Sequence, residues 1–134
     1  MFAAATIVGG GVLDRFPELR IALLEAGSAW GPYLFERLDE HWEKRTGEMR
    51  SQRLPSDYLD EGRLVITCEA ERWLPHAVTG LGAQTVAYAS DYPHWDCEFP
   101  ESVRKIDARD DISAADKAAI LAGNARRILG DHHG

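Results

Sequence analysis

Residues 85–94 read TVAYASDYPH, a short apolar run that leads into a turn carrying Asp91 and His94. The run is nearly continuous rather than alternating, which is typical of a strand that is buried on both faces of a sheet. The same pattern occurs twice upstream, as LRIALLE at residues 19–25 and LVITCE at residues 64–69. The three runs, at residues 19–24, 64–68 and 85–89, predict three buried strands of a parallel sheet.

Helical patterns lie between the predicted strands. The segment AWGPYLFERLDEHWEKR, which follows Ser28, has an apolar residue at every fourth position: Trp30, Leu34, Leu38 and Trp42. This spacing predicts an amphipathic helix with Ser28 as its N-cap. We also expect a helix at residues 72–79, stopped by Gly80 and Gly82, and a helical turn at residues 55–59 capped by Ser56.

The last predicted helix begins after Ser113, which forms a variant capping box with Asp116, and it ends at Gly130. Strand and helix therefore alternate along the chain, which indicates parallel βα units with right-handed crossovers and an α/β fold. A closed barrel of eight such units needs roughly 250 residues. The 134 residues fit a single domain, residues 1–134, which is either about half of such a barrel or a small open sheet.

The composition argues against two kinds of partner. With 15 Lys and Arg against 22 Asp and Glu, the formal net charge is −7, whereas nucleic-acid phosphates attract basic surfaces. No apolar run approaches the roughly 18 residues that a membrane span requires. The two cysteines, Cys68 and Cys97, form no disulfide framework, so we expect a cytoplasmic protein.

Acidic side chains stand at the ends of all three predicted strands: Glu25, Glu69 and Asp91. In parallel α/β folds, the carboxyl ends of the strands meet at the edge where reactive groups collect. Carboxylate oxygens at such an edge can bind a divalent cation. Alternatively, Glu25 and Glu69 are acids at helix N-termini, where the helix dipole favours them.

The turn SDYPH is the most specific candidate site. Asp91 in this turn can hold a metal ion and take up a proton, and His94 can donate to a substrate or orient Asp91. Alternatively, the turn only ends the strand, with Asp91 capping the next segment and His94 packed on Tyr92. The remaining histidines are interpreted as surface or terminal residues: His41, His76, His132 and His133.

Four stretches in this order resemble one known family: GVLDRFPELRIALLEAGSAWGPYLFERLDEHWE, LPSDYL, VAYASDYPHWDCEFPES and NARRILG. They are similar to the carboxyl-terminal part of the amidohydrolase-related metal-dependent hydrolases, the relatives of aminocarboxymuconate-semialdehyde decarboxylase. The resemblance extends from about Gly11 to Gly130. It implies a partial (β/α)₈ barrel, in which this chain supplies strands six to eight with their covering helices.

The resemblance also implies a chemistry. The family carries out metal-dependent hydrolysis or non-oxidative decarboxylation of small carboxylates, many of them aromatic or unsaturated. Asp91 matches the strand-eight aspartate that binds the metal, a divalent ion for which zinc is expected. Glu25 stands in the strand-six run near the metal, where other branches have histidine. Asn124 matches an asparagine for which we expect a structural role.

The family's other metal ligands, an HxH pair on the first strand and a histidine on the fifth, have no counterpart in this chain. A catalytic zinc takes three protein ligands, so the isolated chain is expected to be incomplete as an enzyme. Three hypotheses follow: the carboxyl-terminal half of a hydrolase or decarboxylase, a non-catalytic half-barrel, and an open α/β domain that binds a small molecule. We expect self-association or pairing with a complementary half, because a half-barrel leaves two strand edges open.

Overall fold

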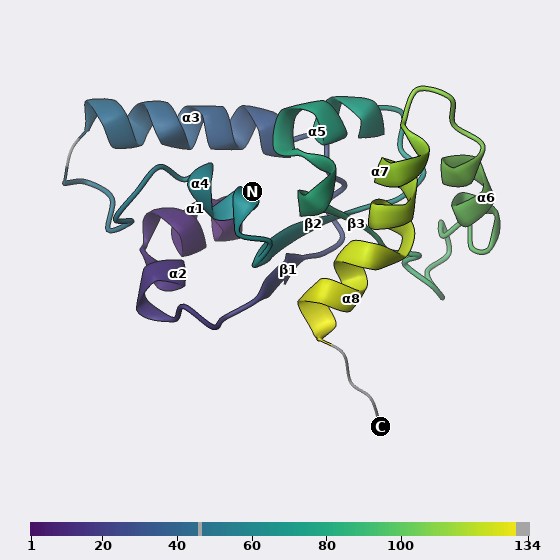
Figure 1. The fold of residues 1–134 in the computed structure, drawn as a ribbon, viewed down its shortest axis with the longest axis horizontal. Helices are drawn as coiled ribbons and strands as arrows, with labels where there is room; N and C mark the ends of the chain where they lie inside the picture. Colours follow the sequence, from purple (N-terminus) through teal and green to yellow (C-terminus); the bar gives the residue numbers. More distant parts are fainter. Residues whose placement is uncertain (46, 131–134) are drawn as a thin grey trace.

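A computed structural model of the chain describes residues 1–45 and 47–130 and shows a small parallel sheet surrounded by helices (Figure 1). The strands are β1 (Ile21–Leu23), β2 (Leu64–Cys68) and β3 (Val86–Tyr88). They lie in the order β1-β2-β3, and both pairs are parallel. The predicted α/β class with three parallel strands is confirmed.

The outer strands are shorter than predicted because each has a partner on one side only in the described part of the chain. All five residues of the central strand β2 are buried. By contrast, β1 stops at Leu23, and Leu24 beyond it is 60% exposed. An apolar run in the sequence thus predicts where a strand lies, while pairing with neighbouring strands decides how many residues of the run form it.

Two helices, α3 (Gly31–Lys44) and α5 (Leu74–Leu81), meet where α3 begins, and α3 extends away from that contact (Figure 1). Their contact is close: a Cβ atom at Gly80 would stand 2.7 Å from the side chain of Pro32. The prediction that Gly80 stops the helix was therefore wrong. Gly80 lies inside α5 and allows the two helices to approach, and the helix ends at Gly82, whose φ is 81°.

The final helix consists of α7 (Ala114–Ala118), a π-helical turn (Ala119–Gly123) and α8 (Asn124–Leu129). Its predicted start is confirmed, since the amide of Asp116 donates to Ser113 Oγ at 3.1 Å. Its predicted end is also confirmed, because the cap residue Gly130 has a φ of 79°.

Among the described residues, the remaining helices are α1 (Phe2–Gly9), α2 (Val12–Arg15), α4 (Asp57–Asp60), a 3-10 turn (Ala83–Thr85) and α6 (Glu101–Asp107). The turn at α4 matches the prediction, although Ser56 makes no side-chain capping bond there. The segment of α2 lies in a stretch that was expected to hold a helix tail and a loop, and the segment of α6 was not predicted to be helical. Short helices owe most of their stability to tertiary packing, and in α6 that packing is the burial of Ile106, which is fully inside the core.

Ser28 is not the N-cap of α3, contrary to the prediction. The helix begins after Trp30, and Ser28 is completely buried, with its hydroxyl donating to Glu71 Oε1 at 2.6 Å. An N-cap serine would accept a hydrogen bond from a backbone amide of the helix, whereas Ser28 donates to a carboxylate, a stronger bond that draws it toward the segment that follows β2.

One hydrophobic core lies between the sheet and the helices. It contains the helix-facing residues of β2, together with residues of α3, α5, α6 and the last helix: Phe35, Leu64, Ile66, Cys68, Leu74, Leu81, Ile106 and Ile120. No helix within residues 1–45 and 47–130 is long and apolar enough to cross a membrane. Burial in this core raises the pKa of the Cys68 thiol to about 12.

The burial of Cys68 leads to a prediction for thiol labelling. At pH 8, a disulfide reagent should modify about one thiol per folded chain, at the half-buried Cys97, because a thiol with a strongly raised pKa forms almost no thiolate. Both thiols should react after unfolding in guanidinium chloride. In Cys97→Ser the folded chain should not react, and rapid labelling of that variant would contradict the burial of Cys68.

Candidate functional site

The carboxyl ends of the three strands surround a cleft of about 240 Å³. Glu25 from the end of β1, Glu69 from the end of β2 and Asp91 from the end of β3 all line this cleft. The parallel sheet therefore brings together three acids that are far apart in the sequence, as their positions after the strands predicted.

Two of these acids have an unusual backbone. Glu25 has a φ of 62° and Asp91 a φ of 53°, and among the described residues they are the only ones besides glycines with a positive φ. This left-handed conformation costs an L-residue on the order of 1 kcal/mol. It turns the chain sharply after β1 and β3, so that each acid remains at the strand end instead of entering the next helix.

The alternative that Glu25 and Glu69 are helix N-terminal acids is wrong. The helices that follow them begin at Gly31 and Leu74, and neither helix has an acid in its first turn. Partial burial at the strand end, and then the nearby charges of Asp91 and Asp96, raise the pKa of Glu69. Glu69 thus stands in a locally negative environment that a cation would neutralise.

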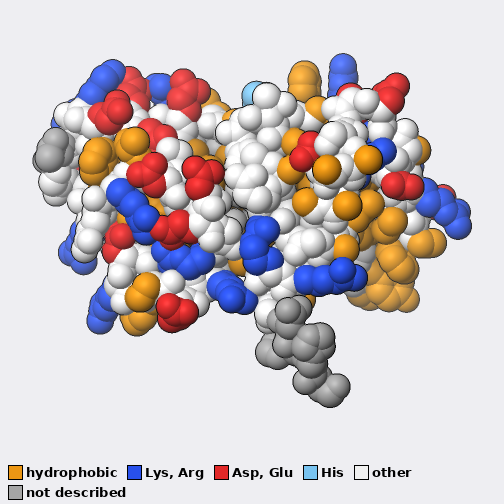
Figure 2. All heavy atoms as spheres, viewed as in Figure 1, with side chains coloured by type: hydrophobic (Ala, Val, Ile, Leu, Met, Phe, Trp, Pro, Cys, Tyr) orange, Lys and Arg blue, Asp and Glu red, His pale blue; other side chains and the backbone are white. Residues whose placement is uncertain are grey.

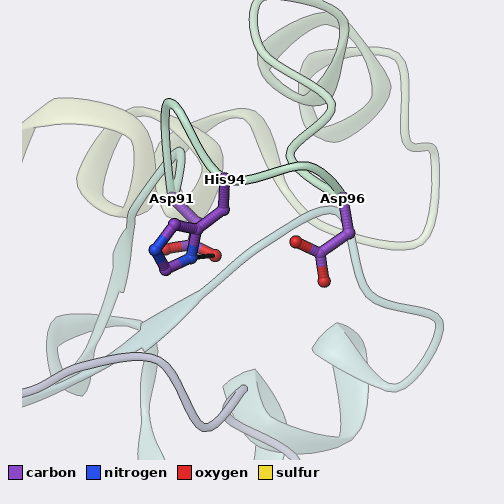
Figure 3. Close-up of side chains that lie close together, drawn as sticks. All are labelled: Asp91, His94 and Asp96. Atoms are coloured by element: carbon purple, nitrogen blue, oxygen red, sulfur yellow. Dashed lines mark hydrogen bonds and ion pairs between the residues drawn. The ribbon is translucent and has the colours of Figure 1, made fainter.

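The turn after β3 forms the most compact group of donors (Figure 3). His94 Nδ1 lies 2.9 Å from Asp91 Oδ2, and this hydrogen bond, followed by the charge of Asp91, raises the pKa of His94. The alternative that His94 packs on Tyr92 is not what the structure shows. Tyr92 instead makes an edge-to-face contact with Phe99, with their ring centroids 6.0 Å apart.

Asp96 joins this group, although sequence reasoning missed it. One ligand atom from each of Asp91, His94 and Asp96 lies within 4.8 Å of the others, and the Asp96 carboxylate points back toward the other two side chains (Figure 3). The signal in the sequence was the spacing D-x-x-H-x-D on a single turn. Two carboxylates and an imidazole are suitable donors for a divalent ion such as manganese or zinc.

Glu25 lies at the same cleft but outside this three-residue group. Its charge contributes to the raised pKa of His94, so the two side chains affect each other. Among the other histidines, His41 is exposed and pairs with Glu48, and His76 is exposed. His132 and His133 lie outside the described residues.

Exposed aromatic side chains lie beside the metal-ligand candidates. Tyr92, Trp95 and Phe99 are 69%, 95% and 51% exposed. Figure 2 shows hydrophobic side chains gathered on the right side of the view, where α6 and the segment leading to it lie in Figure 1. Of these three rings, Tyr92 lines the cleft beside Glu25, Glu69 and Asp91, which suits a small ligand that has both a charged and an apolar part.

Comparisons with known proteins agree on one family. A family model described as Amidohydrolase matches residues 2–130. The chain is 28% identical over 130 residues to the gamma-resorcylate decarboxylase of Polaromonas sp. strain JS666, a match that covers 94% of this chain and 39% of that protein.

Two solved structures have similar folds. The 5-carboxyvanillate decarboxylase of Sphingomonas paucimobilis matches with a TM-score of 0.75 and 28% identity, over 95% of this chain and 38% of that chain. The dihydroxybenzoic acid decarboxylase of Polaromonas sp. JS666, with bound manganese and the inhibitor 2-nitroresorcinol, matches with a TM-score of 0.74 and 26% identity, over 96% of this chain and 39% of that chain. The chain thus spans about two fifths of the length of these relatives, and its sheet corresponds to part of a larger (β/α)₈ barrel.

Proposed function

We propose, from the fact that this chain belongs to the amidohydrolase family, that its cleft is part of the active site of a metal-dependent, non-oxidative decarboxylase of small aromatic carboxylates. The observation that carries the proposal is the convergence of Glu25, Asp91 and His94 on the carboxyl edge of the sheet. Glu25 and Asp91 have a left-handed backbone, and His94 is hydrogen-bonded to Asp91. Decarboxylation is favoured over hydrolysis because the relatives described above are all decarboxylases.

The proposed roles follow from position and donor chemistry. Asp91, which has 19% of its side chain exposed, offers its carboxylate to the metal, and Glu25 offers a second carboxylate from the end of β1. A bound divalent ion, manganese as in the Polaromonas structure or the zinc expected from the sequence, would supply Lewis-acid stabilisation of negative charge on the substrate.

His94 is proposed to deliver the proton that the reaction needs. Loss of carbon dioxide from an aromatic ring requires a proton at the carbon that carried the carboxylate. The hydrogen bond between Nδ1 and Asp91 raises the pKa of His94, which keeps the ring protonated closer to neutral pH. The side chain is 60% exposed, so it can exchange its proton with solvent between turnovers.

The chemistry can be tested by following carbon dioxide release from 2,6-dihydroxybenzoate in the presence of manganese. The chain would be assayed alone and together with the part of the Polaromonas relative that it does not match. We expect release only in the mixture, because this chain offers only part of a metal centre. A mixture that binds manganese and substrate but releases no carbon dioxide would contradict the proposal.

A further proposal concerns assembly. Within the described residues, β1 and β3 each have one edge that pairs with no other strand, and such edges favour association. We propose that these edges are covered by a second copy of the chain or by a complementary half-barrel. In the non-catalytic alternative, a half-barrel that only self-associates, the same edges of β1 and β3 would be covered by a second copy of the chain.

Light scattering on the purified chain tests the assembly. We expect a mass of at least a dimer, that is at least twice 14.9 kDa, because the open edges and the exposed aromatic side chains favour a partner. Dilution over a hundredfold range would show whether the association is reversible. A monomer at every concentration would contradict the proposal.

A further inference from the structure

We propose that Glu71 is a positioning residue that fixes Glu25 at the cleft, together with Thr67; the role of Glu25 itself rests on the proposed function. Glu71 does not line the cleft around Glu25, Glu69 and Asp91. It acts on the segment of residues 24–28, called here the Glu25 loop, which is the first part of the connection from β1 to α3.

The first attachment point of the Glu25 loop is Thr67 in β2. The amide of Glu25 donates to Thr67 Oγ1 at 3.3 Å, and the same hydroxyl donates to the carbonyl of Leu23 at 3.2 Å. One side chain thus holds the loop where it leaves the strand.

The second attachment point is Glu71, in the segment that follows β2. Its Oε1 accepts hydrogen bonds from the amide of Ser28 at 2.8 Å and from the Ser28 hydroxyl at 2.6 Å. Ser28 is completely buried, so these two bonds to a charged acceptor are made largely out of water, where they are strong. The loop is therefore held at both ends by side chains from β2 and the segment after it.

The loop needs this restraint because its backbone is strained. Between the two attachment points, Glu25 has a φ of 62° and Gly27 a φ of 61°. A Cβ atom at Gly27 would lie 3.0 Å from Glu71 Oε2, so the glycine also gives the carboxylate room to approach. Without the bonds to Ser28, the loop would keep only its attachment at Thr67, and the left-handed conformation that holds Glu25 at the strand end would be less well restrained.

Glu71 is itself held from the far side. Its carbonyl accepts from Arg109 Nη1 at 3.2 Å, and Arg109 makes two bonds to Asp111, at 2.8 and 2.7 Å. The position of Glu25 therefore depends on a chain of contacts that reaches the segment after α6.

Amide hydrogen exchange tests the restraint directly. In Glu71→Ala we expect the Ser28 amide to exchange about tenfold faster and the Glu25 amide signal to shift, because a buried donor loses its charged acceptor. Glu71→Gln keeps an acceptor oxygen, and in this variant we expect the Ser28 amide to exchange about threefold faster than in the wild type. If Glu71→Ala does not fold, the exchange rate in Glu71→Gln decides the question. Glu98→Gln, which removes a neighbouring charge without touching Ser28, is the matched control. Unchanged Ser28 exchange in both Glu71 variants would overturn the proposal.

Manganese titration then tests whether the restraint acts through Glu25. Glu71→Ala should weaken manganese binding about fivefold in the wild-type background and leave it unchanged in a Glu25→Gln background, since coupled residues are not additive. If Glu71→Ala lowered manganese affinity equally in both backgrounds, the proposal that Glu71 positions Glu25 would be overturned. If the wild-type chain binds no manganese either alone or mixed with the complementary part of the Polaromonas relative, the proposed function fails, and the exchange experiment alone decides whether Glu71 holds the loop.

Discussion

Asp91→Asn is expected to weaken manganese binding by the isolated chain about tenfold or more, which corresponds to roughly 1.4 kcal/mol or more of binding free energy. The substitution removes the negative charge of a proposed metal ligand while keeping its size. It should not disturb the fold, because asparagine tolerates the left-handed backbone conformation, here a φ of 53°. The measurement is a calorimetric or electron paramagnetic resonance titration with manganese, accompanied by a thermal melt of each variant.

The matched control is Asp57→Asn, which removes one exposed carboxylate from α4, a helix that precedes the amino end of β2. We expect this variant to bind manganese as the wild type does. Equal affinities of the wild type and Asp91→Asn would remove Asp91 from the metal site and with it the main role assigned by the family resemblance.

Asn124→Ala is expected to lower the free energy of unfolding by about 3 kcal/mol, because buried polar groups left without partners are costly. Asn124 is 1% exposed, and its Nδ2 donates to the carbonyls of Ala83 and Val86, each at 2.7 Å. Its Oδ1 accepts from Arg127 Nη1 at 2.7 Å, and Arg127 in turn donates to the carbonyl of Gly62. The amide thus ties the last helix to the segments that enter β2 and β3.

Urea unfolding followed by circular dichroism measures this effect. Gly123→Ala is the control, since a Cβ there would lie at an ordinary 3.7 Å from the carbonyl of Ala118. A helical glycine replaced by alanine should change the unfolding free energy by no more than about 1 kcal/mol, and in the stabilising direction. A loss below about 1 kcal/mol in Asn124→Ala would show that the three bonds do not hold the sheet to the helix.

The structural role of Asn124 was expected from the resemblance, and its bonds to Ala83 and Val86 confirm it. The strand-end positions of Glu25, Glu69 and Asp91 were expected from the apolar runs before them. The left-handed backbone of Glu25 and Asp91 was not expected, because nothing in the local sequence distinguishes an acid that opens a helix from one that ends a strand.

Asp96 and Glu71 show why part of the site escaped sequence reasoning. Asp96 stands in a loop whose path is set by the turn at Asp91, so its approach to His94 is a property of that path. Glu71 finds its partner Ser28 at a separation of 43 residues. No local pattern relates two such positions.

The sequence by itself determined the three strands, their parallel arrangement, the capping of the last helix and the edge at which the acids meet. Each of these follows from residues close together in the chain, through apolar periodicity and capping chemistry. The tertiary structure alone decided the burial of Ser28 against Glu71, the short helices α2 and α6, and the grouping of Asp91, His94 and Asp96. The first two depend on contacts that exist only once the strands and helices pack together, where burial removes water and a distant carboxylate becomes a strong acceptor. The grouping of Asp91, His94 and Asp96 depends on the path that the chain takes through the turn after β3.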